Sequence, residues 1–310
     1  MKKAVKKILV TGGLGFVGSN LVDKLIKQGH EVTVIDNLSS ESSSETYKNK
    51  SAKYYIEDIR NLDLILPAHI PSFDVIFHLA GLARIQPSFT SPLEYVDVNI
   101  NGTARICELA LNHGSKLIYS SSSSIDNGEY KTPYTFSKWG GEEVLKTWIQ
   151  CYKLNASICR FYNVYGPREP KTGDYATVVR KFIRHYQNKE PLTIVGDGEQ
   201  RRDFTHVNDI VNGLISIMNL GEVGDLYHLG RGINYSINEL VKMFGDVEVK
   251  NLPLRKGEGQ VTLADYEETF SKLKWKAVHN LQDYIEGFKH LPAKEKYCLE
   301  NNIDIYLQTK

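Results

Sequence analysis

The first half of the chain alternates short apolar runs with longer stretches in which apolar residues recur at helical spacing. The short runs predict strands at residues 7–10, 32–35, 53–56, 75–79, 116–119 and 156–161. The longer stretches, at residues 16–26, 96–110 and 134–152, follow a period near 3.6 and predict helices. Alternation of this kind predicts an α/β fold with a doubly wound parallel sheet covered by helices on both faces.

The second half is less regular, and Gly, Pro and charged residues separate its apolar segments. Residues 175–186, 207–218, 236–244 and 281–288 predict helices, and residues 225–229 predict a short strand. We expect a smaller α+β lobe packed on the sheet, with residues 1–165 and a return near 203–230 forming the first domain and 166–310 the second. The polar last twenty residues, from Leu291 onward, predict a terminal helix or a loose tail.

Composition excludes several classes of protein. Of 310 residues 41% are hydrophobic, and 38 basic residues balance 37 acidic ones, so a broad nucleic-acid-binding surface is not expected. No apolar run approaches the roughly 20 residues of a membrane helix, and the N-terminus lacks the apolar stretch of a signal peptide. The four cysteines show no zinc-ligand spacing, so we expect free thiols, no metal and a cytoplasmic protein.

A glycine-rich segment lies between the first strand and the first helix. Gly12, Gly15 and Gly18 form Gly-x-x-Gly-x-x-Gly, which allows a tight turn and a close approach of a pyrophosphate to the helix N-terminus. The second strand ends at Asp36, whose carboxylate can accept hydrogen bonds from a ribose and would repel a 2′-phosphate. These features predict a Rossmann-type NAD site rather than an NADP site.

A serine run and a Tyr-x-x-x-Lys pair follow in the middle of the chain. The strand at 116–119 runs into Ser120–Ser124, and Tyr134 and Lys138 stand four residues apart on a predicted helix, hence on one face. An ammonium near a phenol favours the phenolate and lowers the pKa of the phenol, which would make Tyr134 a general base. A serine hydroxyl at the strand end could orient a substrate alcohol.

With these motifs the chain resembles the extended short-chain dehydrogenase/reductases, specifically the nucleotide-sugar epimerase and dehydratase group. The resemblance covers about residues 7–290. Beyond the glycine loop, the serine run, Tyr134 and Lys138, it rests on Asp58-Ile59-Arg60, His78-Leu79-Ala80-Gly81, Asn99-x-x-Gly102-Thr103, the segment Arg160-Phe161-Tyr162-Asn163-Val164-Tyr165-Gly166-Pro167-Arg168, and the segment Gly196-Asp197-Gly198-Glu199-Gln200-Arg201-Arg202-Asp203-Phe204.

The resemblance implies NAD in the first lobe, a UDP-sugar in the second and a homodimer through a four-helix bundle built from residues 94–112 and 134–152. It implies Ser122, Tyr134 and Lys138 as the catalytic residues. The implied cofactor contacts are Gly12, Gly15, Phe16, Val17, Gly18, Asp36, Asn37, Asp58, Ile59, Leu79, Ala80, Ala83, Asn99, Ser120, Tyr134, Lys138 and Phe161. The implied substrate contacts are Arg84, Ser122, Ser123, Asn163, Thr177, Val178, Thr193, Arg202, Arg255, Glu258 and Thr262.

Several reactions share this scaffold, and the residues after Ser122 favour one of them. Dehydratases of the group carry an Asp-Glu pair directly after the catalytic Ser or Thr, and decarboxylases usually carry a Glu two places after it. Ser123 and Ser124 stand there and supply no carboxyl group. A 4-epimerase acting on a UDP-hexose or a UDP-N-acetylhexosamine is therefore favoured. A UDP-glucuronate decarboxylase, a uronate 4-epimerase and a 4,6-dehydratase stay open as alternatives, as does a non-catalytic nucleotide-binding protein.

Three features bear on which sugar is bound. Thr262 matches the position that limits the sugar pocket in the family, and its small side chain would admit an N-acetyl group. Arg84 stands beside the expected sugar pocket and could pair with a uronate carboxylate, or could simply be a charge at the rim. Ser122 and Tyr134 are only 12 residues apart, about half the usual interval, so we expect a more open site or one covered by another segment.

Overall fold

The computed structural model describes residues 4–40, 43–62, 72–173, 175–291, 296, 300 and 301. A seven-stranded sheet crosses the molecule, and every neighbouring pair of its strands is parallel. In spatial order the strands are β11 (Leu226–Leu229), β6 (Ala156–Phe161), β5 (Lys116–Ser122), β4 (Val75–His78), β1 (Lys7–Thr11), β2 (Glu31–Asp36) and β3 (Lys53–Ile56). The strand order reverses between β1 and β4, as in a Rossmann fold.

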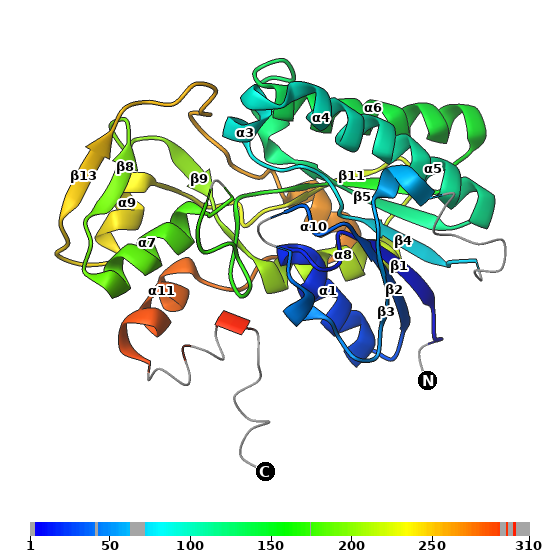
Figure 1. Cartoon of the computed structure of the whole chain (residues 1–310), viewed down its shortest axis with the longest axis horizontal. Coiled ribbons are helices and arrows are strands. Elements are labelled where there is room, and N and C mark those ends of the chain that lie inside the picture. The colour runs from blue at the N-terminus through cyan, green and yellow to red at the C-terminus, as the bar shows by residue number, and fades with distance from the viewer. Residues whose placement is uncertain are drawn as a thin grey trace, which may run out of the picture.

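Helices cover both faces of this sheet (Figure 1). On one face lie α4 (Pro92–Val96), α5 (Gly102–His113) and α6 (Pro133–Tyr152), and on the other lie α1 (Phe16–Lys27) and α8 (Val207–Leu220), with α10 (Glu267–Leu273) packed on α8. The expected doubly wound α/β fold is confirmed.

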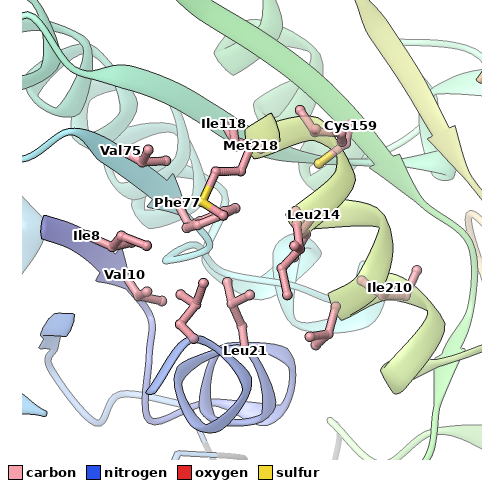
Figure 2. Packing of buried hydrophobic residues seen from close by; sticks show 14 of the residues in the cluster. Ile8, Val10, Leu21, Val75, Phe77, Ile118, Cys159, Ile210, Leu214 and Met218 are labelled. Carbon is pink, nitrogen blue, oxygen red and sulfur yellow. The ribbon is translucent and has the colours of Figure 1, made fainter. Parts of the chain in front are cut away.

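Alternation along the strands explains the two layers. Ile8 and Val10 pack with Leu21 of α1 and Leu214 of α8, as Figure 2 shows, whereas Leu9 points to the opposite core under α5 and α6. Since successive strand side chains face opposite sides, a run of three apolar residues serves two cores at once. All five side chains are fully buried.

The remaining elements form a second region at the left of Figure 1. Its helices α7 (Val178–Asn188), α9 (Ile237–Lys242) and α11 (Leu281–His290) share a core that includes Phe182, Leu240 and Phe288. Three two-stranded sheets complete it: β7 (Val164–Tyr165) with β10 (Thr205–His206), β9 (Arg201–Asp203) with β12 (Asn234–Ser236), and β8 (Leu192–Val195) with β13 (Val249–Leu252). The domain boundary at 165/166 stays a prediction.

Some predicted elements differ from the observed ones. The helix predicted at 96–110 is α4 and α5 joined by a π-helical turn, η3 (Asp97–Asn101). The helix predicted from 175 begins at Val178, because the Thr177 hydroxyl caps it by accepting from the amide of Arg180. The short helices α3 (Ile85–Thr90), η1 (Glu45–Tyr47), η2 (Ile59–Asn61) and η4 (Ser123–Asn127) were not predicted.

The cysteines, the C-terminal residues and the lengths of the helices were also subjects of sequence predictions. Cys107, Cys151 and Cys159 are free thiols, and Cys298 lies outside the described residues, as does most of the predicted tail. Over the described ranges, none of the helices combines the length and apolar character needed to cross a bilayer.

Candidate active site

Two adjoining clefts open at the carboxyl ends of the sheet strands. The first, of about 230 Å³, lies over the ends of β1 and β2. Of the residues expected to contact NAD, it is lined by all but one: Gly12, Gly15, Phe16, Val17, Gly18, Asp36, Asn37, Asp58, Ile59, Leu79, Ala80, Ala83, Ser120, Tyr134, Lys138 and Phe161.

The second cleft, of about 440 Å³, lies between the sheet and the second region. Of the residues expected to contact substrate, it is lined by Arg84, Ser122, Ser123, Asn163, Val178, Thr193, Arg202, Arg255, Glu258 and Thr262. Arg84 and Tyr134 line both clefts. They are among seven residues that the two clefts share, so a ligand in one cleft would lie beside a ligand in the other.

The glycine loop can approach a ligand because Gly12, Gly15 and Gly18 carry no side chain. Gly12 has φ +70°, and a Cβ there would lie 2.7 Å from the backbone nitrogen of Ala80, so the loop rests directly on the end of β4. A Cβ at Gly18 would collide with the carbonyl of Gly12. Gly15 begins α1 without any side-chain cap among the described residues, which leaves the first amides of the helix facing the cleft. This cradle fits a pyrophosphate.

Two carboxylates stand at the far end of the same cleft. Asp36 accepts hydrogen bonds from the amides of Leu14 (2.9 Å) and Leu38 (2.8 Å), which fixes its position at the end of β2. Asp58 pairs with Arg60, and these hydrogen bonds lower the pKa of Asp58 to about 2. Both groups are therefore held as acceptors where the ribose and adenine of NAD are expected.

Tyr134 and Ser122 come together where the clefts meet. Ser122 ends β5, Tyr134 stands at the start of α6, and both side chains line the larger cleft. Burial raises the pKa of Tyr134, and the hydrogen bond from Ser122 and the charge of Arg84 partly offset that rise. The expected lowering of this pKa by Lys138 is not observed: the Lys138 ammonium lies 4.6 Å from the ring centroid of Tyr119, where burial lowers its pKa to about 8.

Two expected contact residues, Asn99 and Thr177, line neither cleft, and their contacts with ligands stay predictions. Asn99 accepts from the amide of Leu82 and donates to its carbonyl (2.8 and 2.9 Å), so it holds the loop after β4 instead of lining the cofactor cleft. Thr177 donates to the buried carboxyl of Glu169 (2.5 Å) as it caps α7. Burial raises the pKa of Glu169 to about 7. Both residues have polar atoms that are hydrogen-bonded within the protein.

The wall of the larger cleft is preorganised by hydrogen bonds. Asn163 donates to the Thr262 hydroxyl (2.8 Å), and Arg202 pairs with Glu258 (3.3 Å). Thr262 is only 8% exposed, and its side chain borders the cleft. Guanidinium groups at such a wall suit phosphate oxygens.

The segment at residues 255–262 covers this cleft from the second region. Gln86 donates to the carbonyl of Lys256 (2.9 Å), and the Lys256 ammonium lies 4.8 Å from the ring centroid of Phe89. Asn127, in the short loop after Ser122, donates to the carbonyl of Val261 (3.2 Å). Of the two expectations for the short loop, coverage by another segment is therefore the observed one.

Sequence reasoning missed several residues that line the clefts. Gln86 and Lys131 line the larger cleft, and Tyr175 lines the smaller one. Gln86 follows Arg84 closely and could have been inferred from it. Lys131 and Tyr175 lie in irregular segments with no periodic signal, and only the folded chain brings them to the site.

The fold and these clefts define a nucleotide-dependent α/β enzyme, and comparison with known proteins specifies the family. Residues 8–230 match the NAD dependent epimerase/dehydratase family, and the chain belongs to that family. A putative UDP-glucose 4-epimerase of Methanocaldococcus jannaschii is 34% identical over 248 residues, which is 75% of this chain and 79% of that protein. Decarboxylases of UDP-linked uronic acids are also among its relatives.

Solved structures give the same result. A UDP-glucose 4-epimerase of Thermotoga maritima, crystallised with UDP-glucose, has a TM-score of 0.85 and 32% identity, and the match covers 90% of this chain and 96% of that one. A UDP-glucuronic acid 4-epimerase of Bacillus cereus, in complex with UDP-glucuronic acid and NAD, has a TM-score of 0.82 and 27% identity over 94% and 98% of the two chains. The protein is an NAD-dependent enzyme of this family, and its cradle of glycines and carboxylates fits that cofactor.

Proposed function

We propose that the protein is a UDP-sugar 4-epimerase that keeps its NAD bound through each turnover. The observation that carries this proposal is the placement of the Ser122–Tyr134 hydroxyl pair where the two clefts meet. A sugar in the larger cleft would present its 4-hydroxyl to this pair and its C4 to the smaller cleft.

NAD, when bound, would supply the acceptor for the hydride at C4 of the sugar and would be the donor that returns it to the other face. Tyr134 takes the proton of the 4-hydroxyl and later gives it back, while Ser122 orients that hydroxyl. Arg84 supplies positive charge that favours the deprotonated phenol, and Lys138, which lines the smaller cleft, would contact the cofactor there. Arg202 and Arg255 line the larger cleft and would bind the diphosphate.

Epimerisation is favoured over elimination of water because the carboxyl groups nearest Ser122 are paired with other side chains of the protein. Ser123 and Ser124 line the larger cleft, and Ser124 Oγ has no hydrogen-bond partner within the described chain. Asp126 lies close by but lines neither cleft, because Arg160 and Tyr162 hold its two oxygens. Glu258 is paired with Arg202. A dehydratase needs an acid at the position that Ser123 or Ser124 occupies here.

The test of the proposed function is a product assay without added cofactor. UDP-glucose, UDP-N-acetylglucosamine and UDP-glucuronic acid are each incubated with the purified protein and analysed by chromatography and mass spectrometry. A new peak of unchanged mass supports the proposal. Loss of water or of carbon dioxide assigns the protein to the dehydratase or decarboxylase branch instead.

We expect Thr262→Tyr to suppress turnover of N-acetylated UDP-sugars while sparing the plain hexose, because the larger ring fills the space that an N-acetyl group needs. Thr262→Ser keeps the hydroxyl that Asn163 and the amide of Asp203 contact (2.8 and 3.2 Å), so it serves as the control and should accept both sugars. The measurement is kcat/KM for UDP-glucose and UDP-N-acetylglucosamine. Equal loss of both in Thr262→Tyr would contradict this assignment.

A second candidate substrate class is favoured by Arg84. Its Nη2 donates to the carbonyl of Tyr175 (2.5 Å), its φ is +97°, and its buried Nε has no hydrogen-bond partner within the described residues. A buried guanidinium N–H without an acceptor is costly, so a ligand that supplies an anion there gains affinity. The carboxylate of a uronate, one carbon beyond C5 of the sugar ring, would supply one.

If the substrate is a uronate, Arg84→Gln should lower kcat/KM for UDP-glucuronic acid by about 10-fold or more relative to UDP-glucose, the size of one lost charged hydrogen bond. Lys131→Gln removes one cation from an exposed part of the same cleft and is the matched control. The NAD content of both variants is measured after purification. Equal losses for both sugars, with a fall in NAD content, would show that Arg84 serves the cofactor instead.

We also propose a homodimer through α5 and α6, a cytoplasmic location and a role in making surface polysaccharides, all by analogy with the family. Sedimentation of the purified protein tests the first of these. A monomer at micromolar concentration would contradict it.

A further inference from the structure

The connection between Ser122 and α6 is short, and the structure indicates how it is held. β5 ends at Ser122, η4 spans Ser123–Asn127, and α6 begins at Pro133. The first turn of this loop is closed by two hydrogen bonds, from the amide of Ser124 to the Ser122 hydroxyl (3.2 Å) and from the amide of Gly128 to the carbonyl of Ile125 (2.9 Å). These local bonds do not attach the loop to the rest of the protein.

Asn127 attaches the loop to the segment at 255–262 through the carbonyl of Val261 (3.2 Å), and Asp126 attaches it to the sheet. One of its carboxylate oxygens accepts from Arg160 Nη1 (2.7 Å), and the other accepts from the Tyr162 hydroxyl (2.6 Å). Arg160 lies one residue before the end of β6 and Tyr162 directly follows the strand, so the loop is fixed to the neighbouring strand of the sheet. The Tyr162 hydroxyl in turn accepts from His228 Nδ1 (2.7 Å).

The contacts continue from Arg160 to the catalytic elements. Arg160 Nε and Nη2 donate to the two oxygens of Glu142 (both 2.9 Å), and Glu142 is almost fully buried. Glu142 stands on α6 four residues after Lys138, so the two share a helix face. The Ser121 hydroxyl also donates to Glu142 (2.5 Å), and Ser121 directly precedes Ser122. A closed set of charge-assisted hydrogen bonds therefore joins the loop, β6, α6 and β5.

We infer that Asp126 is a positioning residue for the Ser122–Tyr134 pair, and that it acts through Arg160 and Tyr162. Asp126 touches neither cleft, so it has no direct part in the chemistry. Its role is to hold both ends of a connection that would otherwise let Ser122 and Tyr134 drift apart. This inference rests on the proposed function only in so far as turnover is its kinetic readout.

Arg160 alone cannot replace this function. Its pairing with Glu142 joins α6 to β6 whether or not Asp126 is present, whereas Asp126 is the side chain through which the loop is hydrogen-bonded to β6 and Tyr162 within the described chain. Misplacement of a reacting group by about 1 Å can cost up to about 100-fold in rate. Loss of Asp126 should therefore appear in kcat, while substrate affinity, set mainly by the far wall of the cleft, changes little.

The experiment compares Asp126→Ala and Asp126→Glu with a matched control, Asp225→Ala. Asp225 likewise accepts from a tyrosine hydroxyl (Tyr227, 2.8 Å) and from a cation (Lys272, 2.8 Å), but it lies just before β11 and lines neither cleft. Asp126→Ala should lower kcat by about 10- to 100-fold with KM within about threefold and unchanged NAD content. Asp126→Glu should recover most of the rate, and Asp225→Ala should keep it.

Two kinetic results would overturn the inference: a kcat of Asp126→Ala within about threefold of wild type, or a loss no larger than that of Asp225→Ala at equal thermal stability. Hydrogen exchange gives a readout that does not need turnover. The amides of Ser124 and Gly128 should lose protection in Asp126→Ala and keep it in Asp225→Ala. Unchanged protection of these amides in Asp126→Ala would overturn the inference. Failure of the wild-type protein to epimerise any of the sugars would count against the proposed function and would leave this exchange test of Asp126 in place.

Discussion

Replacement of Tyr134 by phenylalanine should lower kcat by about 10²- to 10⁴-fold, the range that a positioned general acid–base contributes. The variant keeps the ring that lines both clefts and loses only the hydroxyl that meets Ser122. The NAD content of the purified protein should therefore stay at the wild-type level. Initial rates and cofactor content, measured on the same preparation, check both parts.

A neighbouring phenol provides the control for Tyr134. The ring of Tyr95 lies edge-on to that of Tyr134 at 6.2 Å, and its hydroxyl donates to the carbonyl of Ala83 (3.0 Å), but it lines neither cleft. Tyr95→Phe should therefore keep kcat within about threefold of wild type. If Tyr95→Phe and Tyr134→Phe lost the same activity, the assignment of Tyr134 as the proton acceptor would be wrong.

The second large effect concerns the glycine loop. Gly18→Ala should destabilise the protein by about 1–3 kcal/mol or more and abolish NAD retention, because its Cβ would collide with the backbone carbonyl of Gly12. Helix propensity alone predicts the opposite sign, since Ala is favoured over Gly in a helix by about 1 kcal/mol. The collision is with backbone on both loop residues, so no side chain can move aside to relieve it. Thermal unfolding and cofactor content measure the two effects.

Gly15→Ala distinguishes an effect on protein stability from an effect on NAD binding by this loop. A Cβ at Gly15 would lie 3.3 Å from the Gly12 carbonyl oxygen, and its φ of −79° suits any residue. This variant should unfold within about 1 kcal/mol of wild type and lose only NAD affinity, because its methyl group enters the space of the pyrophosphate. A Gly18→Ala variant as stable and as NAD-rich as wild type would refute the predicted close contact.

The sheet could be predicted from the sequence because its signal is local. The glycine loop, Asp36 and the strands β1, β2, β4 and β5 each carry their pattern within a few residues. The strands β8 and β13 could not be predicted in this way. β13 is largely exposed and has no apolar alternation, and it becomes a strand only because β8, more than fifty residues earlier, pairs with it.

The candidate site, like the sheet, could be predicted from the sequence only in part. Motif spacing placed Tyr134 and Lys138 on one helix face, but it could not show that Arg84, from the loop after β4, shares the charge environment of the phenol. It also could not show that Asn99 is hydrogen-bonded to Leu82, or that Thr177 is hydrogen-bonded to Glu169. Such contacts join segments distant in sequence, and they depend on packing that no local pattern encodes.

In the proposed reaction one hydride leaves C4 of the sugar and returns to the same carbon within one bound complex. The most direct measurement uses a UDP-sugar that the protein converts, deuterated at C4, with no added cofactor, and follows the label by NMR and mass spectrometry. We expect an epimer that keeps its deuterium at C4, with none released to solvent or to free NAD. Loss of the label, or a requirement for added cofactor at every turnover, would contradict it.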